Sequence, residues 1–178
     1  MASADHPTRA KLLEAGLNLA EDHALTALSI EDIVNTAGVA KGTFYVHFPD
    51  RGSFFVALYE RFNDQVRVRM REAVDGLPPG RARLEGAAHA YLDGALQVAG
   101  VRAMLGNGLG DPAMAEHIVS TNDRFARSAV DDMAAMGRSH PLESARLFVA
   151  MTAQIALLER MQQQADPNLR AALGEYLD

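Results

Sequence analysis

Apolar residues recur every three to four positions along most of the chain, and no stretch alternates apolar and polar residues as a half-buried β-strand would. The clearest example is Ile30, Ile33, Val34 and Ala37, which fall at i, i+3, i+4 and i+7. This spacing puts one apolar stripe on a helix. The sequence therefore predicts an all-α protein with about nine helices.

Capping residues, prolines and glycines divide this pattern into separate helices. The predicted helices span about residues 7–21, 30–37, 41–46, 51–74, 81–99, 101–105 and 112–136, followed by a long helix that opens at Pro141 and a last helix from Pro167 to Leu177.

The second and third predicted helices form a helix-turn-helix. Ser29 precedes the first apolar stripe with Asp32 three residues later, a pairing that caps and charges a helix start. Gly38 follows the stripe where a left-handed residue ends a helix. In the next, short helix we expect Phe44 and Phe48 to point inward, which leaves an outer face suited to phosphates and bases.

The run GVAKGTFYVHFPDR resembles the signature of the TetR (tetracycline repressor) family of bacterial transcriptional regulators, and the resemblance extends from Thr8 to Phe62. It implies that the helix from Lys41 lies in the major groove of DNA, supported from behind by the first helix. Ala40 departs from the usual Ser of the family, and Val46 from a common aromatic residue or His.

The resemblance also implies the DNA-binding residues. Lys41 and Thr43 would face the DNA, the backbone at Gly42 would approach it closely, and Tyr45, His47 and Arg51 would hold phosphates. Ser29, at the start of the first motif helix, completes the set.

We expect two domains: a DNA-binding domain at residues 1–50 and a ligand-binding and dimerisation domain at residues 51–178. The long fourth helix starts the second domain, and the breaker Gly76 to Gly80 follows it. Three glycines within Gly106–Gly110 predict a hinge or a tight corner.

Two residue sets in the second domain are candidates for further contacts. An adaptable cavity for a small, apolar effector is implied by the family and would be lined by Tyr91, Leu92, Leu96, Met104, Leu105, Thr121, Asn122, Phe125, Phe148 and Met151. Ordinary core packing is the alternative at each of these positions. A homodimer interface is expected at Ala145, Val149, Thr152, Ala153, Ala156, Leu169, Leu173 and Tyr176.

Composition narrows the function. The chain has 178 residues, a net charge of −6 and no Cys, so it has no disulfide framework or Cys-based zinc site, and the net charge argues against non-specific coating of nucleic acid. The first 51 residues hold four Lys/Arg against seven Asp/Glu, but the acidic residues fall mainly on the first two helices. With no leader or apolar span, we expect a soluble, cytoplasmic protein.

No residue pattern indicates catalysis or a cofactor. His89 and Asp93, one turn apart, are the only pair with ligand-like spacing, and a solvated helix face is the simpler interpretation. We therefore expect no enzyme activity, metal or cofactor. The resemblance to the TetR family implies instead a dimeric, ligand-responsive regulator of transcription, most often a repressor in that family, that binds a palindromic operator. The alternative is a helical small-molecule-binding or modifying protein whose N-terminal bundle docks another protein.

Overall fold

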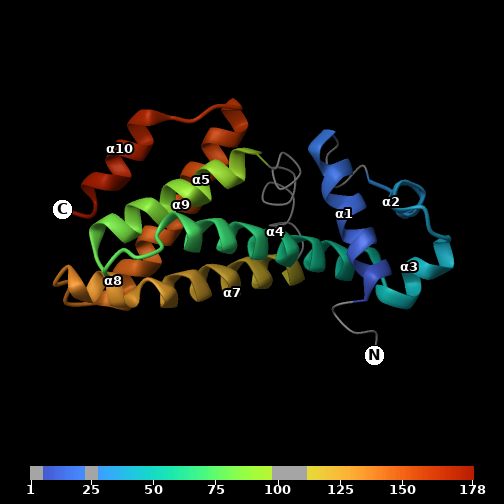
Figure 1. The fold of residues 1–178 in the computed structure, drawn as a ribbon, viewed down its shortest axis with the longest axis horizontal. Coiled ribbons are helices and arrows are strands. Elements are labelled where there is room, and N and C mark those ends of the chain that lie inside the picture. Colours follow the sequence, from blue (N-terminus) through green and yellow to red (C-terminus); the bar gives the residue numbers. More distant parts are fainter. Residues whose placement is uncertain (1–5, 23–27, 98–111) are drawn as a thin grey trace. The chain divides into compact units, whose positions relative to one another are not determined.

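The computed structural model describes residues 6–22, 28–97 and 112–178. These residues form nine helices and no strand (Figure 1), which confirms the predicted all-α fold. The helices are α1 (Pro7–Asp22), α2 (Ile30–Ala37), α3 (Lys41–His47), α4 (Arg51–Ala73), α5 (Arg81–Gln97), α7 (Pro112–Ser128), α8 (Val130–Ala135), α9 (Pro141–Gln162) and α10 (Pro167–Glu175). The short helix predicted at 101–105 and the corner Gly106–Gly110 lie outside the described residues.

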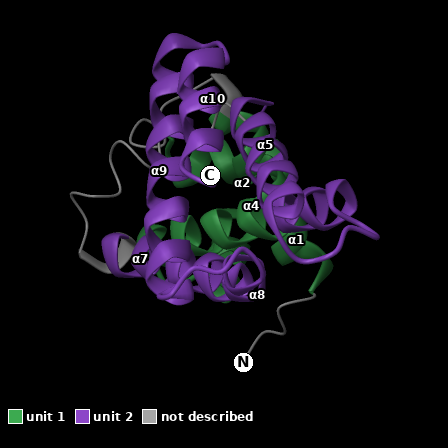
Figure 2. Cartoon of the chain, turned by 90° about the vertical axis from the view of Figure 1, so that its left-hand side faces the viewer, with its two compact units in different colours: residues 1–64, 98–114 green, residues 65–97, 115–178 purple. Residues whose placement is uncertain are grey.

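The chain divides into two compact units (Figure 2). Unit 1 comprises residues 1–64 and 98–114, and unit 2 comprises residues 65–97 and 115–178. The division therefore falls within α4, not at residue 50, because the first part of α4 buries Phe54, Leu58 and Phe62 in unit 1. The functional domain boundary at residue 50 stays a prediction.

In unit 1, α1 packs on α2 and α3, and the first part of α4 closes the core. The rings of Phe44, Phe48 and Phe54 lie 5.0 to 5.4 Å apart, centroid to centroid. Gly16 of α1 makes room for this part of α4, since a Cβ there would lie 2.6 Å from Cζ of Phe54. Gly16 thus admits a side chain between the helices.

Unit 2 has its core among α5, α8, α9 and α10, with Leu84, Leu92, Met133 and Phe148 among its buried residues. Asp132 is also buried. Its carboxylate accepts hydrogen bonds from Arg83 Nε at 2.6 Å and from the Gly80 amide at 2.9 Å. This carboxylate fixes α8 against the start of α5 and against the turn that precedes it.

The helix predicted at 112–136 is wrong as a single element, because it breaks between α7 and α8 at Ala129. Ala129 has φ −100° and ψ 1°, and its amide bonds to Ala126 O, three residues back, instead of continuing the α-helical ladder. The Ser128 hydroxyl meanwhile donates to Phe125 O at 2.7 Å. After the break, Asp132 and Met133 are both buried in unit 2.

Among the described residues, no helix is both long enough and apolar enough to cross a lipid bilayer.

Candidate nucleic-acid interface

The turn between α2 and α3 is built from local hydrogen bonds. Ser29 Oγ accepts the Asp32 amide at 3.1 Å, and the Asp32 carboxylate accepts the Ser29 amide at 3.0 Å, which forms a capping box. Gly38 ends α2 with φ 66° and ψ 38°, a left-handed conformation that suits glycine. The predicted cap at Ser29 and the predicted left-handed residue at Gly38 are both confirmed. The turn after Gly38 sets where α3 begins.

Ser29 is already engaged as a cap. Its hydroxyl also donates to Asp32 at 2.6 Å, so its oxygen is part of the capping box at the start of α2. Its contact with DNA stays a prediction.

Helix α3 has one buried side and one open side. Phe44 and Phe48, four residues apart, are buried in the aromatic core of unit 1, as predicted. Gly42 lies on the open side, since a Cβ added to it would meet nothing within 4 Å. Tyr45 is 50% exposed and packs its ring edge against Phe44, with 5.5 Å between centroids. The open side of α3 therefore lies over the aromatic core of unit 1.

Lys41, at the first position of α3, is exposed, and its Nζ lies 3.8 Å from Glu31 Oε2. Both side chains are more than half exposed, so this ion pair contributes little to stability. Thr43 is half-buried beside it. The ammonium group is accordingly free to exchange Glu31 for another anion at low cost.

His47, at the end of α3, contacts residues that the sequence did not suggest. Its ring lies 4.7 Å from that of His6, and its buried Nδ1 has no hydrogen-bond partner in the described part of the chain. Burial, then the charges of His6 and Arg9, lower the pKa of His47. The Arg9 guanidinium lies 5.1 Å from the Phe48 ring centroid. These groups are about forty residues apart in sequence, so no spacing signal could reveal the cluster.

Arg51, the first residue of α4, lies with its guanidinium 4.9 Å from the centroid of the Phe55 ring, a cation–π contact. The preceding residue, Asp50, caps α4 through a 2.7 Å bond from the Ser53 amide. Hydrogen bonds from the Ser53 amide and hydroxyl lower the pKa of Asp50. The start of α4 thus places the guanidinium group of Arg51 directly after the capping carboxylate of Asp50.

Val46 is the residue of α3 that the sequence analysis noted only as a departure from the family pattern. Its side chain is 71% exposed. Single exposed valines are common on protein surfaces, so exposure alone does not assign a role to Val46.

The residues predicted to line an effector cavity differ in burial. Leu92, Thr121 and Phe148 are buried, Leu96, Asn122 and Met151 are half-buried, and Met104 and Leu105 lie outside the described residues. Tyr91 and Phe125 meet edge to face with 6.0 Å between ring centroids, and burial raises the pKa of the Tyr91 hydroxyl. Their part in a cavity stays a prediction.

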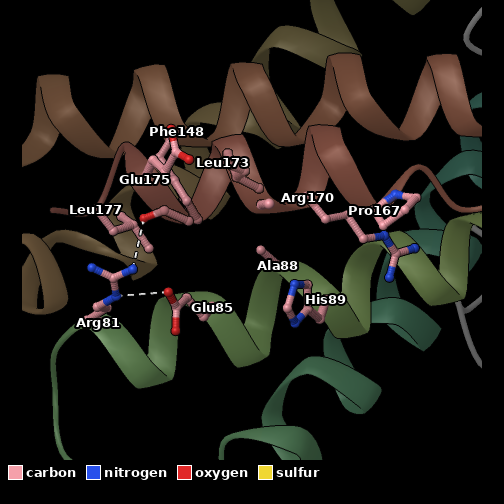
Figure 3. Close-up of a pocket in the computed structure, with 12 residues that line it drawn as sticks. Arg81, Glu85, Ala88, His89, Phe148, Pro167, Arg170, Leu173, Glu175 and Leu177 are labelled. Carbon is pink, nitrogen blue, oxygen red and sulfur yellow. Dashed lines mark hydrogen bonds and ion pairs between the residues drawn. The ribbon is translucent and has the colours of Figure 1, made fainter.

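A cavity of about 620 Å³ lies elsewhere in unit 2, between α5, α9 and α10 (Figure 3). Among the described residues of the predicted set, Phe148 alone lines this cavity. Its two arginines are already engaged: Arg81 with Glu85 at 2.8 Å, and Arg170 with Glu159 at 2.7 Å. Asp93 accepts from Arg170 at 2.7 Å. No group of three or more potential metal ligands occurs among the described residues.

The predicted dimer interface stays a prediction, and the chain itself covers half of its residues. Ala145, Thr152, Ala156 and Leu173 are buried in the core of unit 2, because the small face of α9 packs against the helices of its own chain. Val149, Ala153, Leu169 and Tyr176 are half-buried. A different face of α9 is open, where Leu147 is 60% and Met161 is 72% exposed. Ala150 and Gln154 between them are also exposed.

These features define an all-α protein with a helix-turn-helix. Residues 12–58 match the model of the bacterial regulatory proteins of the tetR family. The chain is 45% identical over 49 residues to the HTH-type regulator YwcC of Bacillus subtilis, covering 28% of this chain and 22% of YwcC. It is 34% identical over 68 residues to the transcriptional repressor NemR of Escherichia coli, covering 38% of this chain and 34% of NemR.

A solved structure is similar over nearly the whole chain. A Rhodococcus sp. protein assigned to the TetR family has a TM-score of 0.81 at 18% identity, covering 97% of this chain and 98% of that one. Residues 12–58 thus resemble the tetR-family regulators in sequence, and the chain has the fold of that solved structure, with an N-terminal helix-turn-helix and a C-terminal helical region. The curated relatives YwcC and NemR are matched over only about a fifth and a third of their length.

Proposed function

We propose that this protein is a transcriptional repressor that binds a palindromic operator as a homodimer and is released by a small apolar effector. The observation that carries the proposal is the open side of α3, which presents Gly42 and Tyr45 beside Lys41 over the aromatic core of unit 1. A short helix with such a side fits the major groove.

Each exposed group has a role within this proposal. Lys41 gives up its ion pair with Glu31 and binds a base edge or a phosphate instead. The hydroxyl groups of Tyr45 and Thr43 donate hydrogen bonds to the DNA backbone. Gly42 lets the helix approach the bases closely. His47 at the end of α3 and Arg51 at the start of α4 complete the phosphate contacts, and Ser29 contributes from the start of α2.

The homodimer supplies two such heads, one for each half of the operator. We place its interface on the open face of α9, at positions that repeat every three to four residues: Leu147, Ala150, Met151, Gln154, Leu158 and Met161. The effector occupies unit 2, and no cofactor takes part.

DNA titrations test the proposal. A duplex is selected from a random pool by the wild-type protein, and binding to it is compared with binding to a scrambled duplex at one salt concentration. Lys41→Ala is expected to lose about 1 to 3 kcal/mol and base discrimination if Lys41 reads a guanine edge. Arg51→Ala is expected to weaken both duplexes alike, because a phosphate contact carries no sequence information.

Arg71→Ala is the matched control, since it removes an exposed cation from the part of α4 in unit 2. Its binding is expected to equal that of the wild type. Equal affinity of the wild-type protein for the selected and scrambled duplexes would remove the proposed function.

A further inference from the structure

Val46 lies opposite the buried side of α3. Phe44 and Phe48 point into the core, and two residues along a helix turn the direction by about 200°. Gly42 and Val46, each two residues before one of these phenylalanines and four residues apart, therefore share the face that points directly away from the core. Thr43 and Tyr45 flank that face.

The exposed fractions of the side chains agree with this arrangement. Val46 is 71% exposed, more than Tyr45 at 50%, and Gly42 has open space where its Cβ would be. The most outward part of the helix is thus an apolar side chain next to a position with no side chain. The absent side chain at Gly42 allows close approach to a surface, and Val46 would be the first side chain that the surface meets.

The chemistry of Val46 limits what it can contact favourably. Its side chain has two methyl groups and neither donates nor accepts a hydrogen bond, so contact with a phosphate or a polar base edge gains nothing. In the major groove, the one apolar group among the base edges is the C5-methyl group of thymine.

We propose that Val46 reads the C5-methyl group of a thymine in each operator half-site. This inference rests on the proposed function, because it requires α3 to lie in the major groove. It adds a residue that sets sequence preference by apolar contact, beside the polar contacts of Lys41 and Thr43.

The test removes the methyl group from the DNA and the side chain from the protein. Wild-type protein first selects a duplex from a random pool, and each thymine of the half-site is then replaced symmetrically by deoxyuridine. The synthetic duplex holds no 5-methylcytosine, so thymine is its only source of a C5-methyl group. One replacement is expected to weaken wild-type binding about fourfold per half-site, since burying one methyl-sized group contributes about 0.8 kcal/mol.

The same replacement is expected to leave the affinity of Val46→Ala unchanged, because that variant has already lost the contact. Val46→Ala removes an exposed side chain and is expected to fold normally. Val68→Ala is the matched control: it removes another exposed valine, on α4 in unit 2, and is expected to keep the wild-type response to deoxyuridine.

The outcomes separate this inference from the proposed function. Failure to select any duplex would remove the proposed function. Specific binding to a duplex whose half-sites lack thymine, or whose deoxyuridine forms bind equally, would overturn the role of Val46 alone. An equal deoxyuridine effect in wild type and Val46→Ala would also overturn it, because another residue would then read the methyl group.

Discussion

Two glycines of unit 1 differ in the space around them. Gly16 is enclosed, with Phe54 Cζ 2.6 Å from the position of a Cβ, whereas Gly42 has nothing within 4 Å of that position. The side chains of Phe54 and Leu58 from α4 occupy the space beside Gly16. The sequence shows that a glycine lies within a helix. It does not show which side chain of another helix requires a glycine at that position.

Gly42→Ala is expected to separate stability from DNA binding. Alanine fits the open space and favours the helix, so the free energy of unfolding should stay the same or rise by up to about 1 kcal/mol. The added methyl group would hold α3 away from the bases, so operator affinity should fall by about 1 to 3 kcal/mol, as for one lost base contact. Urea denaturation and operator titration measure the two effects, and unchanged operator affinity would contradict the close approach.

The His47 cluster gives a pH-dependent stability. Burial and the charges of His6 and Arg9 hold its pKa below the usual 6.5, so the folded protein favours neutral His47 more than the unfolded chain does. Its contribution to stability is therefore fully present above pH 6.5 and is lost as the pH falls through the pKa of the folded state.

Urea denaturation between pH 8 and pH 5 checks this expectation. Stability should fall as the pH is lowered, and part of that fall should be absent in His47→Gln. His89→Gln, which changes an exposed histidine of α5, is the control and should follow the wild type. Identical pH profiles for the wild type and His47→Gln would show that the cluster has no such effect.

At the scale of elements, helix starts were the most predictable feature. Ser29, Asp50 and Asp166 each cap a helix with a side-chain oxygen, and the helices predicted from residues 30, 51 and 167 begin directly after them. The break at Ala129 had no such signal, because neither glycine nor proline occurs there. Tertiary contacts of α8, above all those of Asp132 with Arg83 and the Gly80 amide, come from residues about fifty positions away in the sequence.

Helix α3 lacks a side-chain cap, and a substitution at its N-cap position could supply one. Ala40 occupies the N-cap position with φ −71° and ψ 147°, the extended conformation of a capping residue, but it has no oxygen to offer. Ala40→Ser is expected to raise the free energy of unfolding by about 1 kcal/mol. Urea denaturation measures this change. Ala37→Ser, inside α2, is the control and should give no gain.

At the scale of the whole molecule, the small and the exposed residues of α9 lie on different sides of the helix. The small residues of α9 face the chain's own core, where close packing of neighbouring helices needs them. Its open face includes Leu147 and Met161, which are more than half exposed, together with the polar residues Glu143 and Gln154. Periodicity reveals two faces on such a helix, but which one the chain itself covers depends on where α5, α8 and α10 pack.

Ala150→Arg tests this face, because it puts a charge at the centre of the open side without touching the core. A stable interface needs about 800 Å² from each partner, and a buried, unpaired charge at its centre is incompatible with that contact. Light scattering at micromolar concentration is expected to give a dimer for the wild type and a monomer for Ala150→Arg. Operator affinity should fall together with dimerisation, since two half-sites need two linked DNA-binding units.

Ala82→Arg, at an exposed alanine of α5, should remain dimeric and bind the operator. A monomeric wild type would refute the dimer, whereas a dimeric Ala150→Arg with full operator affinity would move the interface away from this face of α9.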